Sequence, residues 1–236
     1  MYTIQNQIHI DAYEKSMNIK KSRSYQSIEI LSLRYVSAFF CACFGMGCVE
    51  EEIKASFPDG LQPLSEMRID VPSEGYEEEN WISSSQDEGD YAWAQGRGYI
   101  HGSIDDVWER LRLPEVFINH DEVVEYHITN VVPPEYDYHF IAYNRSENIV
   151  DVEFENEWRH GALENRNGNI ERVGVRWQKI SGTEFIQSLE GSIQILAIDD
   201  AEMDVVEVQV IEHLTATLNQ EDNAKAYIDG LWERWH

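Results

Sequence analysis

The segment Asp151–Arg159 alternates strictly between apolar and polar side chains, and this pattern restricts the fold more than any other feature. Val152, Phe154 and Trp158 share one face, whereas acidic residues and an arginine occupy the other. Such alternation is typical of a strand with one face in the core and one in water. It predicts an antiparallel sheet, because parallel strands are usually buried on both faces.

Other segments show the same period of two and are separated by turn-forming residues such as Gly182 and the pair Asp199 and Asp200. Because consecutive antiparallel strands can be joined by short turns, the pattern predicts a meander of about seven strands. The expected strands cover residues 92–101, 125–130, 136–144, 151–159, 172–180, 185–198 and 204–217.

Two short helices are expected after the first of these strands. Ser103 can cap the segment 104–111, with Asp106 three residues further on, and the apolar residues of this segment recur at helical spacing. Pro114 ends the first helix and begins a second that runs through Asn119.

A long helix is expected to close the chain. Ala224, Ile228, Leu231 and Trp235 recur at i, i+4, i+7 and i+11, which places them on one apolar stripe. The expected order is therefore a strand, two short helices, a run of strands and a long terminal helix. This order is typical of the α+β class.

In this order of elements, residues 91–236 resemble the START-like or Bet v 1-like superfamily, also called SRPBCC or helix-grip. The resemblance rests on the segment Gly102–Leu111, on the strand between Gly182 and Gly191, and on Tyr227, Ile228 and Leu231 of the last helix. It implies a helix-grip fold, in which a curved antiparallel sheet wraps around the C-terminal helix. It also implies an apolar cavity between them that holds a hydrophobic small molecule or a lipid.

The candidate cavity residues are those that the alternation places on inward faces. Asn156 and Glu212 are polar residues in such positions, where a buried polar group needs a partner, so each could hold a ligand or lie near a sheet end in water. The apolar candidates could equally fill a core. They are Trp108, Tyr138, Phe140, Phe154, Trp158, Val175, Trp177, Leu189, Ile228, Leu231 and Trp235.

Three functions remain open at this stage. The first is binding or carriage of a hydrophobic ligand, the second is cyclase- or hydrolase-type catalysis in the same cavity, and the third is a cavity-free interaction module. The histidines lack metal-ligating spacing, and His160 is expected in water at a strand end. No nucleophile elbow, phosphate loop or dinucleotide motif occurs, so no metal, cofactor or catalytic residue is predicted.

The chain is strongly acidic, with 44 Asp and Glu against 18 Lys and Arg and a formal net charge of −26. Nucleic-acid affinity depends largely on basic groups that neutralise phosphates, so a nucleic-acid partner is not expected. Anionic lipid surfaces also attract basic segments, so any membrane contact should depend on an anchor.

Residues 1–48 are interpreted as a targeting segment, in which Met17 is an alternative start. Tyr35–Gly47 is uncharged and follows a basic region, as in secretory signals, and is too short to span a bilayer as a helix. The segment Phe44–Cys48 resembles the lipobox of bacterial lipoproteins, which implies a periplasmic or outer-surface protein lipidated at Cys48. The segment Phe40–Cys43 is a second candidate. Secretion without lipidation and retention in the cell are the alternatives.

Residues 49–90 are acidic and rich in turn-forming residues, so they are expected to form a flexible tether before a domain that begins at residue 91. All three cysteines, Cys41, Cys43 and Cys48, precede this segment, which excludes a disulfide framework for the domain.

We expect Cys48 to be the only cysteine in the mature protein, because all three cysteines gather at the targeting segment. Mass spectrometry of protein purified from its native host should find a lipid-modified Cys48 as the first residue. An unmodified peptide spanning Phe44–Lys54 in most of the mature protein would contradict this expectation.

Overall fold

A computed structural model describes residues 60–73, 75–132, 136–147, 150–198 and 203–236. The targeting segment expected over residues 1–48, with Met17 and Cys48, lies outside these ranges. None of the helices within the described ranges has the length and hydrophobicity that a membrane-spanning helix needs.

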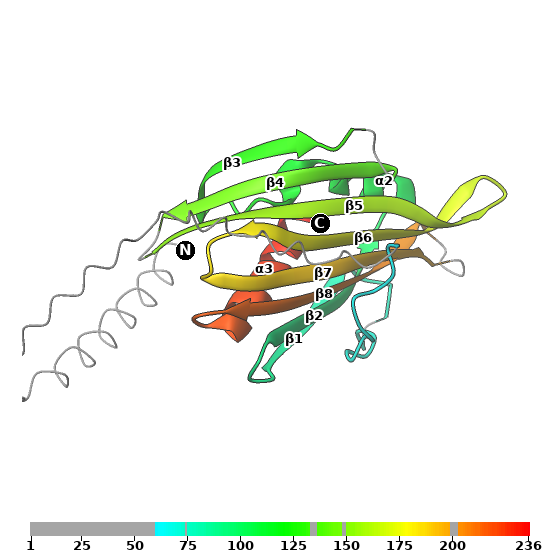
Figure 1. The fold of residues 1–236 in the computed structure, drawn as a ribbon. Helices are drawn as coiled ribbons and strands as arrows, with labels where there is room; N and C mark the ends of the chain where they lie inside the picture. The colour runs from blue at the N-terminus through cyan, green and yellow to red at the C-terminus, as the bar shows by residue number, and fades with distance from the viewer. Residues whose placement is uncertain (1–59, 74, 133–135, 148–149, 199–202) are drawn as a thin grey trace, which may run out of the picture. The chain divides into compact units, whose positions relative to one another are not determined.

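The described chain builds one antiparallel sheet of eight strands in the order β1-β2-β8-β7-β6-β5-β4-β3 (Figure 1). The α+β class and the antiparallel meander are confirmed, although the sheet has one strand more than expected. The strands are β1 Asn80–Asp87, β2 Ala92–His101, β3 Val123–Asn130, β4 Tyr138–Glu147, β5 Asp151–Arg166, β6 Asn169–Gly182, β7 Ile186–Ala197 and β8 Val205–Ala216.

The helices are α2 Ile104–Leu111, the short 3₁₀ helix η1 Pro114–Phe117, and α3 Gln220–Trp235. The Ser103 hydroxyl accepts a hydrogen bond from the backbone N–H of Asp106, so the expected cap of α2 is confirmed. Helix α3 packs against β1, β2 and β8, whereas α2 packs against β6 and β7. The helices and the inward face of the curved sheet form one hydrophobic core.

The prediction of a flexible tether over residues 49–90 is wrong for its described part. Strand β1 lies within that range and pairs along its whole length with β2. Trp81 of β1 stacks on Trp232 of α3 with ring centroids 4.7 Å apart, and its indole Nε1 donates to Asp229 at 2.8 Å. The domain therefore begins before residue 91, and β1 covers part of α3.

A second part of the same range, residues 61–69, crosses the outer face of the sheet, and we call it the strap. Leu61 is only 3% exposed. It lies against Gly161 and Gly174, where an added Cβ would come within 2.9 Å of Leu61 atoms. These two glycines therefore leave the space that the strap occupies.

Polar side chains on the outer face of the sheet hold the strap by its backbone. Gln194 Nε2 donates to the Leu61 carbonyl at 2.9 Å, and Arg176 Nη1 donates to the Gln62 carbonyl at 3.1 Å. Gln95 accepts from the backbone N–H of Arg68 at 2.7 Å and donates to the Glu66 carbonyl at 3.0 Å. These bonds give partners to Gln95, Arg176 and Gln194, which are nearly fully buried.

Substitution of Leu61 by Ala tests whether the strap is part of the folded domain. Because Leu61 is buried, Leu61→Ala should lower the free energy of unfolding by about 2–4 kcal/mol. Val71, which is 50% exposed, gives a matched control, and Val71→Ala should change it by less than about 0.5 kcal/mol. Urea unfolding measures both. Equal stability of Leu61→Ala and the unchanged chain would show that the strap adds nothing.

Candidate functional site

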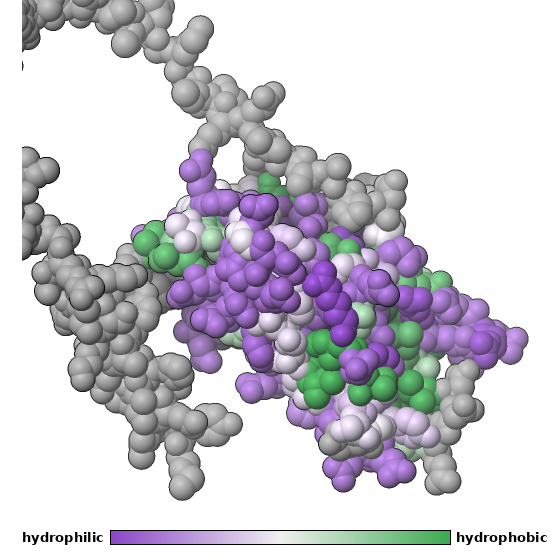
Figure 2. All heavy atoms as spheres, turned by 90° about the horizontal axis from the view of Figure 1, so that it is seen from below, coloured by the Kyte–Doolittle hydropathy of each residue, from purple (hydrophilic) through white to green (hydrophobic). Residues whose placement is uncertain are grey.

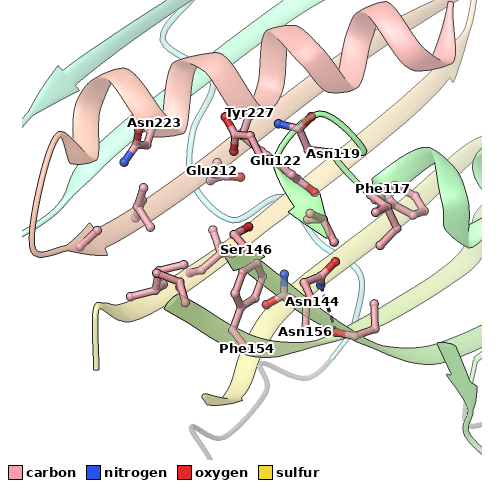
Figure 3. A pocket seen from close by; sticks show the side chains of 18 of the residues that line it. Phe117, Asn119, Glu122, Asn144, Ser146, Phe154, Asn156, Glu212, Asn223 and Tyr227 are labelled. Atoms are coloured by element: carbon pink, nitrogen blue, oxygen red, sulfur yellow. Dashed lines mark hydrogen bonds between the residues drawn. The ribbon is translucent and has the colours of Figure 1, made fainter. Parts of the chain in front are cut away.

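A cavity of about 260 Å³ lies between the inward face of the sheet, helix α3 and the segment that follows η1 (Figure 3). Its inner part is lined by buried residues, whereas Glu122, Asn223 and Ala226 are exposed and mark its mouth. The lining consists of Phe117, Ile118, Asn119, Glu122, Val123, Ala142, Asn144, Ser146, Val152, Phe154, Asn156, Trp158, Phe185, Ile186, Leu189, Glu212, Leu214, Ala216, Asn223, Ala226 and Tyr227.

Large aromatic side chains fill the core beside the cavity. In the register of the sheet, Phe140 is opposite Trp158, Trp158 is opposite Trp177, and Trp177 is opposite Gly191. The Trp158 and Trp177 rings stack with centroids 4.9 Å apart, and Phe117 stacks on Trp158 at 4.0 Å. These contacts form the wall that separates the packed core from the cavity.

Gly191 is required by this wall. A Cβ at Gly191 would lie 2.0 Å from Cζ2 of Trp177, so the indole of Trp177 occupies the place of a side chain on the neighbouring strand. The next residue in the same row is Glu212 of β8, which is opposite Gly191. The row thus changes from stacked aromatic rings to a carboxyl group that lines the cavity.

Three polar side chains that line the cavity each contain a buried atom without a hydrogen-bond partner in the described part of the chain. Asn156 Oδ1, Glu212 Oε2 and the Tyr227 hydroxyl have no hydrogen-bond partner among the residues that the structure describes. Asn156 is 3% exposed and Glu212 is 1% exposed. A buried polar atom without a partner costs free energy, and such atoms are rare in folded proteins.

The surroundings of Glu212 and Tyr227 favour their neutral forms. Burial raises the pKa of the Glu212 carboxyl well above its ordinary value. The pKa of the Tyr227 phenol is also raised, first by burial and then by the nearby carboxyl of Glu212. In these forms, both groups can donate a hydrogen bond.

The opposite wall carries two amides. Asn144 of β4 and Asn156 of β5 point into the cavity across from Glu212 and Tyr227 (Figure 3). Asn144, which is 5% exposed, donates from Nδ2 to the Ala142 carbonyl at 3.3 Å. Polar groups thus face each other across a largely apolar space.

Five of the residues predicted from the sequence line this cavity: Phe154, Asn156, Trp158, Leu189 and Glu212. Asn156 and Glu212 are buried at inward positions, so the alternative of a sheet end in water is wrong for both. The other predicted residues do not line this cavity and belong to the core or pack against it. They are Trp108, Tyr138, Phe140, Val175, Trp177, Ile228, Leu231 and Trp235.

Sequence reasoning missed much of the lining. Asn144 continues the inward row of Tyr138, Phe140 and Ala142 on β4 and ends the strand expected over residues 136–144, so following the alternation to the end of that strand would have found it. Tyr227 adjoins the apolar stripe of α3. Residues 117–123 reach the cavity because the chain turns back after η1, and no periodic signal marks that turn.

The expectation that His160 lies in water is also wrong. Strand β5 continues to Arg166, so His160 is inside the strand and fully buried. Phe117, Tyr138 and Phe140 surround its ring. Burial is the main cause that lowers the pKa of His160 to about 3, so the imidazole is a neutral part of the core. In the part of the chain that the structure describes, no group of three or more His, Cys, Asp or Glu residues is placed to bind a metal.

No protein-family model matches the sequence, and no curated protein matches it. Among solved structures, an uncharacterised protein from Rhizobium leguminosarum has a TM-score of 0.40 and 9% identity, with 65% of this chain and 95% of that chain covered. A protein from Thermus thermophilus has a TM-score of 0.35 and 14% identity, with 66% and 96% covered.

Major latex-like protein 151 from Panax ginseng has a TM-score of 0.37 and 10% identity, with 62% of this chain and 95% of that chain covered. Likenesses of this strength do not assign the chain to a family. Membership of the START-like or Bet v 1-like superfamily therefore stays a prediction from the sequence.

Replacement of Glu212 by Gln tests the electrostatics of the cavity. Because the pKa of Glu212 is raised in the folded state, stability should fall as pH rises from about 4.3, the unfolded value, through the folded value. Glu212→Gln cannot ionise at this position, so the variant does not lose stability in this way. The free energy of unfolding of the variant minus that of the unchanged chain should therefore be larger at about pH 8 than at about pH 4.

Thermal unfolding at the two pH values measures this difference. Glu164, whose side chain is 60% exposed, gives the control, because Glu164→Gln removes one charge at the surface. A Glu212→Gln effect that matches the control at both pH values would show that Glu212 titrates as a surface carboxylate.

Proposed function

We propose that this domain binds a hydrophobic small molecule or a lipid in the cavity between α3 and the sheet. One observation carries the proposal: a cavity of about 260 Å³ lies beside a tightly packed aromatic core and contains unpartnered buried polar atoms. Ligand sites are typically concave and mostly apolar, with a few polar groups that fix orientation. The volume suits a molecule of two or three rings or a short alkyl chain.

The arrangement of elements supports the same proposal. The curved sheet covers one side of α3, and the cavity lies between the two, as the predicted helix-grip fold requires. Residues of strands β4, β5, β7 and β8 line the side of the cavity formed by the sheet. The exposed residues at its mouth mark where a ligand could enter from solvent. The third function considered from the sequence, a module without a cavity, does not fit this geometry.

Binding is favoured over catalysis by the composition of the lining. Among the described residues, the lining includes Ser146 and two glutamates but no histidine, cysteine or lysine. Nucleophilic catalysis by Ser146 would need an adjacent base, and the described contacts show none for this side chain. The polar groups of the cavity are therefore interpreted as ligand contacts.

We further propose that the protein is exported and tethered to a membrane through Cys48. The sequence of the targeting segment supports this placement, and the net charge of −26 suits a soluble domain at a surface. Figure 2 shows one face of the domain on which hydrophilic residues predominate and hydrophobic residues are confined to smaller areas.

A pair of Ala→Leu substitutions tests the cavity. Ala142 is buried and lines the cavity, so Ala142→Leu should fill empty space and change stability by less than about 1 kcal/mol. Binding of the neutral fluorophore N-phenyl-1-naphthylamine should become weaker by at least about tenfold. Fluorescence titration measures this binding, and urea unfolding measures the stability.

Ala224, which is buried in the core and does not line the cavity, gives the matched control. Ala224→Leu should cost about 1–3 kcal/mol through overpacking while fluorophore binding is retained. If the unchanged chain binds no fluorophore, and Ala142→Leu costs as much as Ala224→Leu, the cavity is closed and the proposed function fails.

A further inference from the structure

Resting on the proposed function, we propose that the ligand is an uncharged amphipathic molecule whose hydroxyl or carbonyl oxygen is bound by Glu212 and Tyr227. These two side chains come from β8 and α3, and both line the cavity (Figure 3).

The two side chains leave hydrogen-bonding capacity unused at the same end of the cavity. Glu212 Oε2 and the Tyr227 hydroxyl are both buried, and neither has a hydrogen-bond partner within the described ranges. A protonated carboxyl and a phenol each offer one O–H donor. A single oxygen with two lone pairs, as in a carbonyl or hydroxyl group, can accept from both.

The surroundings of Glu212 argue against a charged ligand. Among the described residues no lysine, arginine or histidine forms an ion pair with Glu212, which is 1% exposed. A cationic ligand would first have to remove the proton of a buried carboxyl and would then lose its own hydration. An anionic ligand would lose its hydration in a cavity whose described lining has no lysine, arginine or histidine to pair with it. It would also pass Glu122 at the mouth of the cavity.

An uncharged oxygen avoids these costs. A ligand oxygen without charge can accept hydrogen bonds from Glu212 and Tyr227, and no charged group has to be desolvated. The apolar body of the ligand then lies against the remaining lining, which includes Phe154, Leu189 and Leu214. Ordered water could satisfy the same polar atoms, and the experiment below distinguishes water from a ligand oxygen.

The test compares three probes with the same chain length, namely 1-decanol, decylammonium and decanoate, as competitors of bound N-phenyl-1-naphthylamine at neutral pH. In the unchanged protein, decanol should bind at least about tenfold more tightly than either ion. Tyr227→Phe keeps the ring and removes the hydroxyl, so it should weaken decanol binding by about five- to tenfold. Glu212→Met, which removes the other donor, should do the same.

The fluorophore provides the internal control, because its affinity should change by less than about twofold in both variants. Tyr138 gives a matched control residue, since it packs against the core and does not line the cavity. Tyr138→Phe should leave decanol binding unchanged.

Each outcome decides the proposal. If Tyr227→Phe and Glu212→Met leave decanol affinity unchanged, water occupies the polar end and the class is wrong. If decanol binds no more tightly than decanoate, the class is wrong because the cavity accepts an anion. In both cases fluorophore binding still supports the proposed function. Tighter binding of decylammonium would assign a cationic ligand instead. Failure of the fluorophore itself to bind would overturn the proposed function, and this inference with it.

Discussion

The packing of α3 against β1, β2 and β8 is the contact on which the other features depend. Ile228, Leu231 and Trp235 are almost completely buried there, and burial of one such side chain contributes roughly 1.5–3 kcal/mol. Because the sheet curves, a straight helix that packs on these three strands does not contact β4 and β5 closely, and space remains between it and their inward faces. Aromatic rings fill that space at one end, and the cavity remains at the other.

Both faces of the sheet use buried polar side chains, but for different purposes. On the outer face, Gln95, Arg176 and Gln194 are hydrogen-bonded to the backbone of the strap. On the inner face, Asn156 and Glu212 each have a buried oxygen without a partner within the described chain. This contrast distinguishes polar groups that complete the fold from polar groups that are available to a ligand.

The sequence predicted the sheet well because the period of two in β5, β6 and β8 requires one buried face. It missed β1, because three consecutive serines, Ser83–Ser85, interrupt any apolar alternation in an edge strand. It found Asn156 and Glu212 as inward polar residues. It could not tell which inward apolar residues fill the core, because that depends on the approach of α3 and on the space that Gly191 gives to Trp177.

The strap also affects how the domain folds and opens. The backbone carbonyl of Leu61 accepts a hydrogen bond from Gln194, which is 133 residues further along the sequence. The carbonyl of Gln62 accepts one from Arg176, which is 114 residues further along. Contacts between such distant residues carry a large loop-closure cost, and the strap binds side chains of both β6 and β7. The strap therefore docks most readily on a sheet that is already paired. It can also detach while the strands stay paired, so its backbone amides should exchange with solvent faster than those of the sheet beneath.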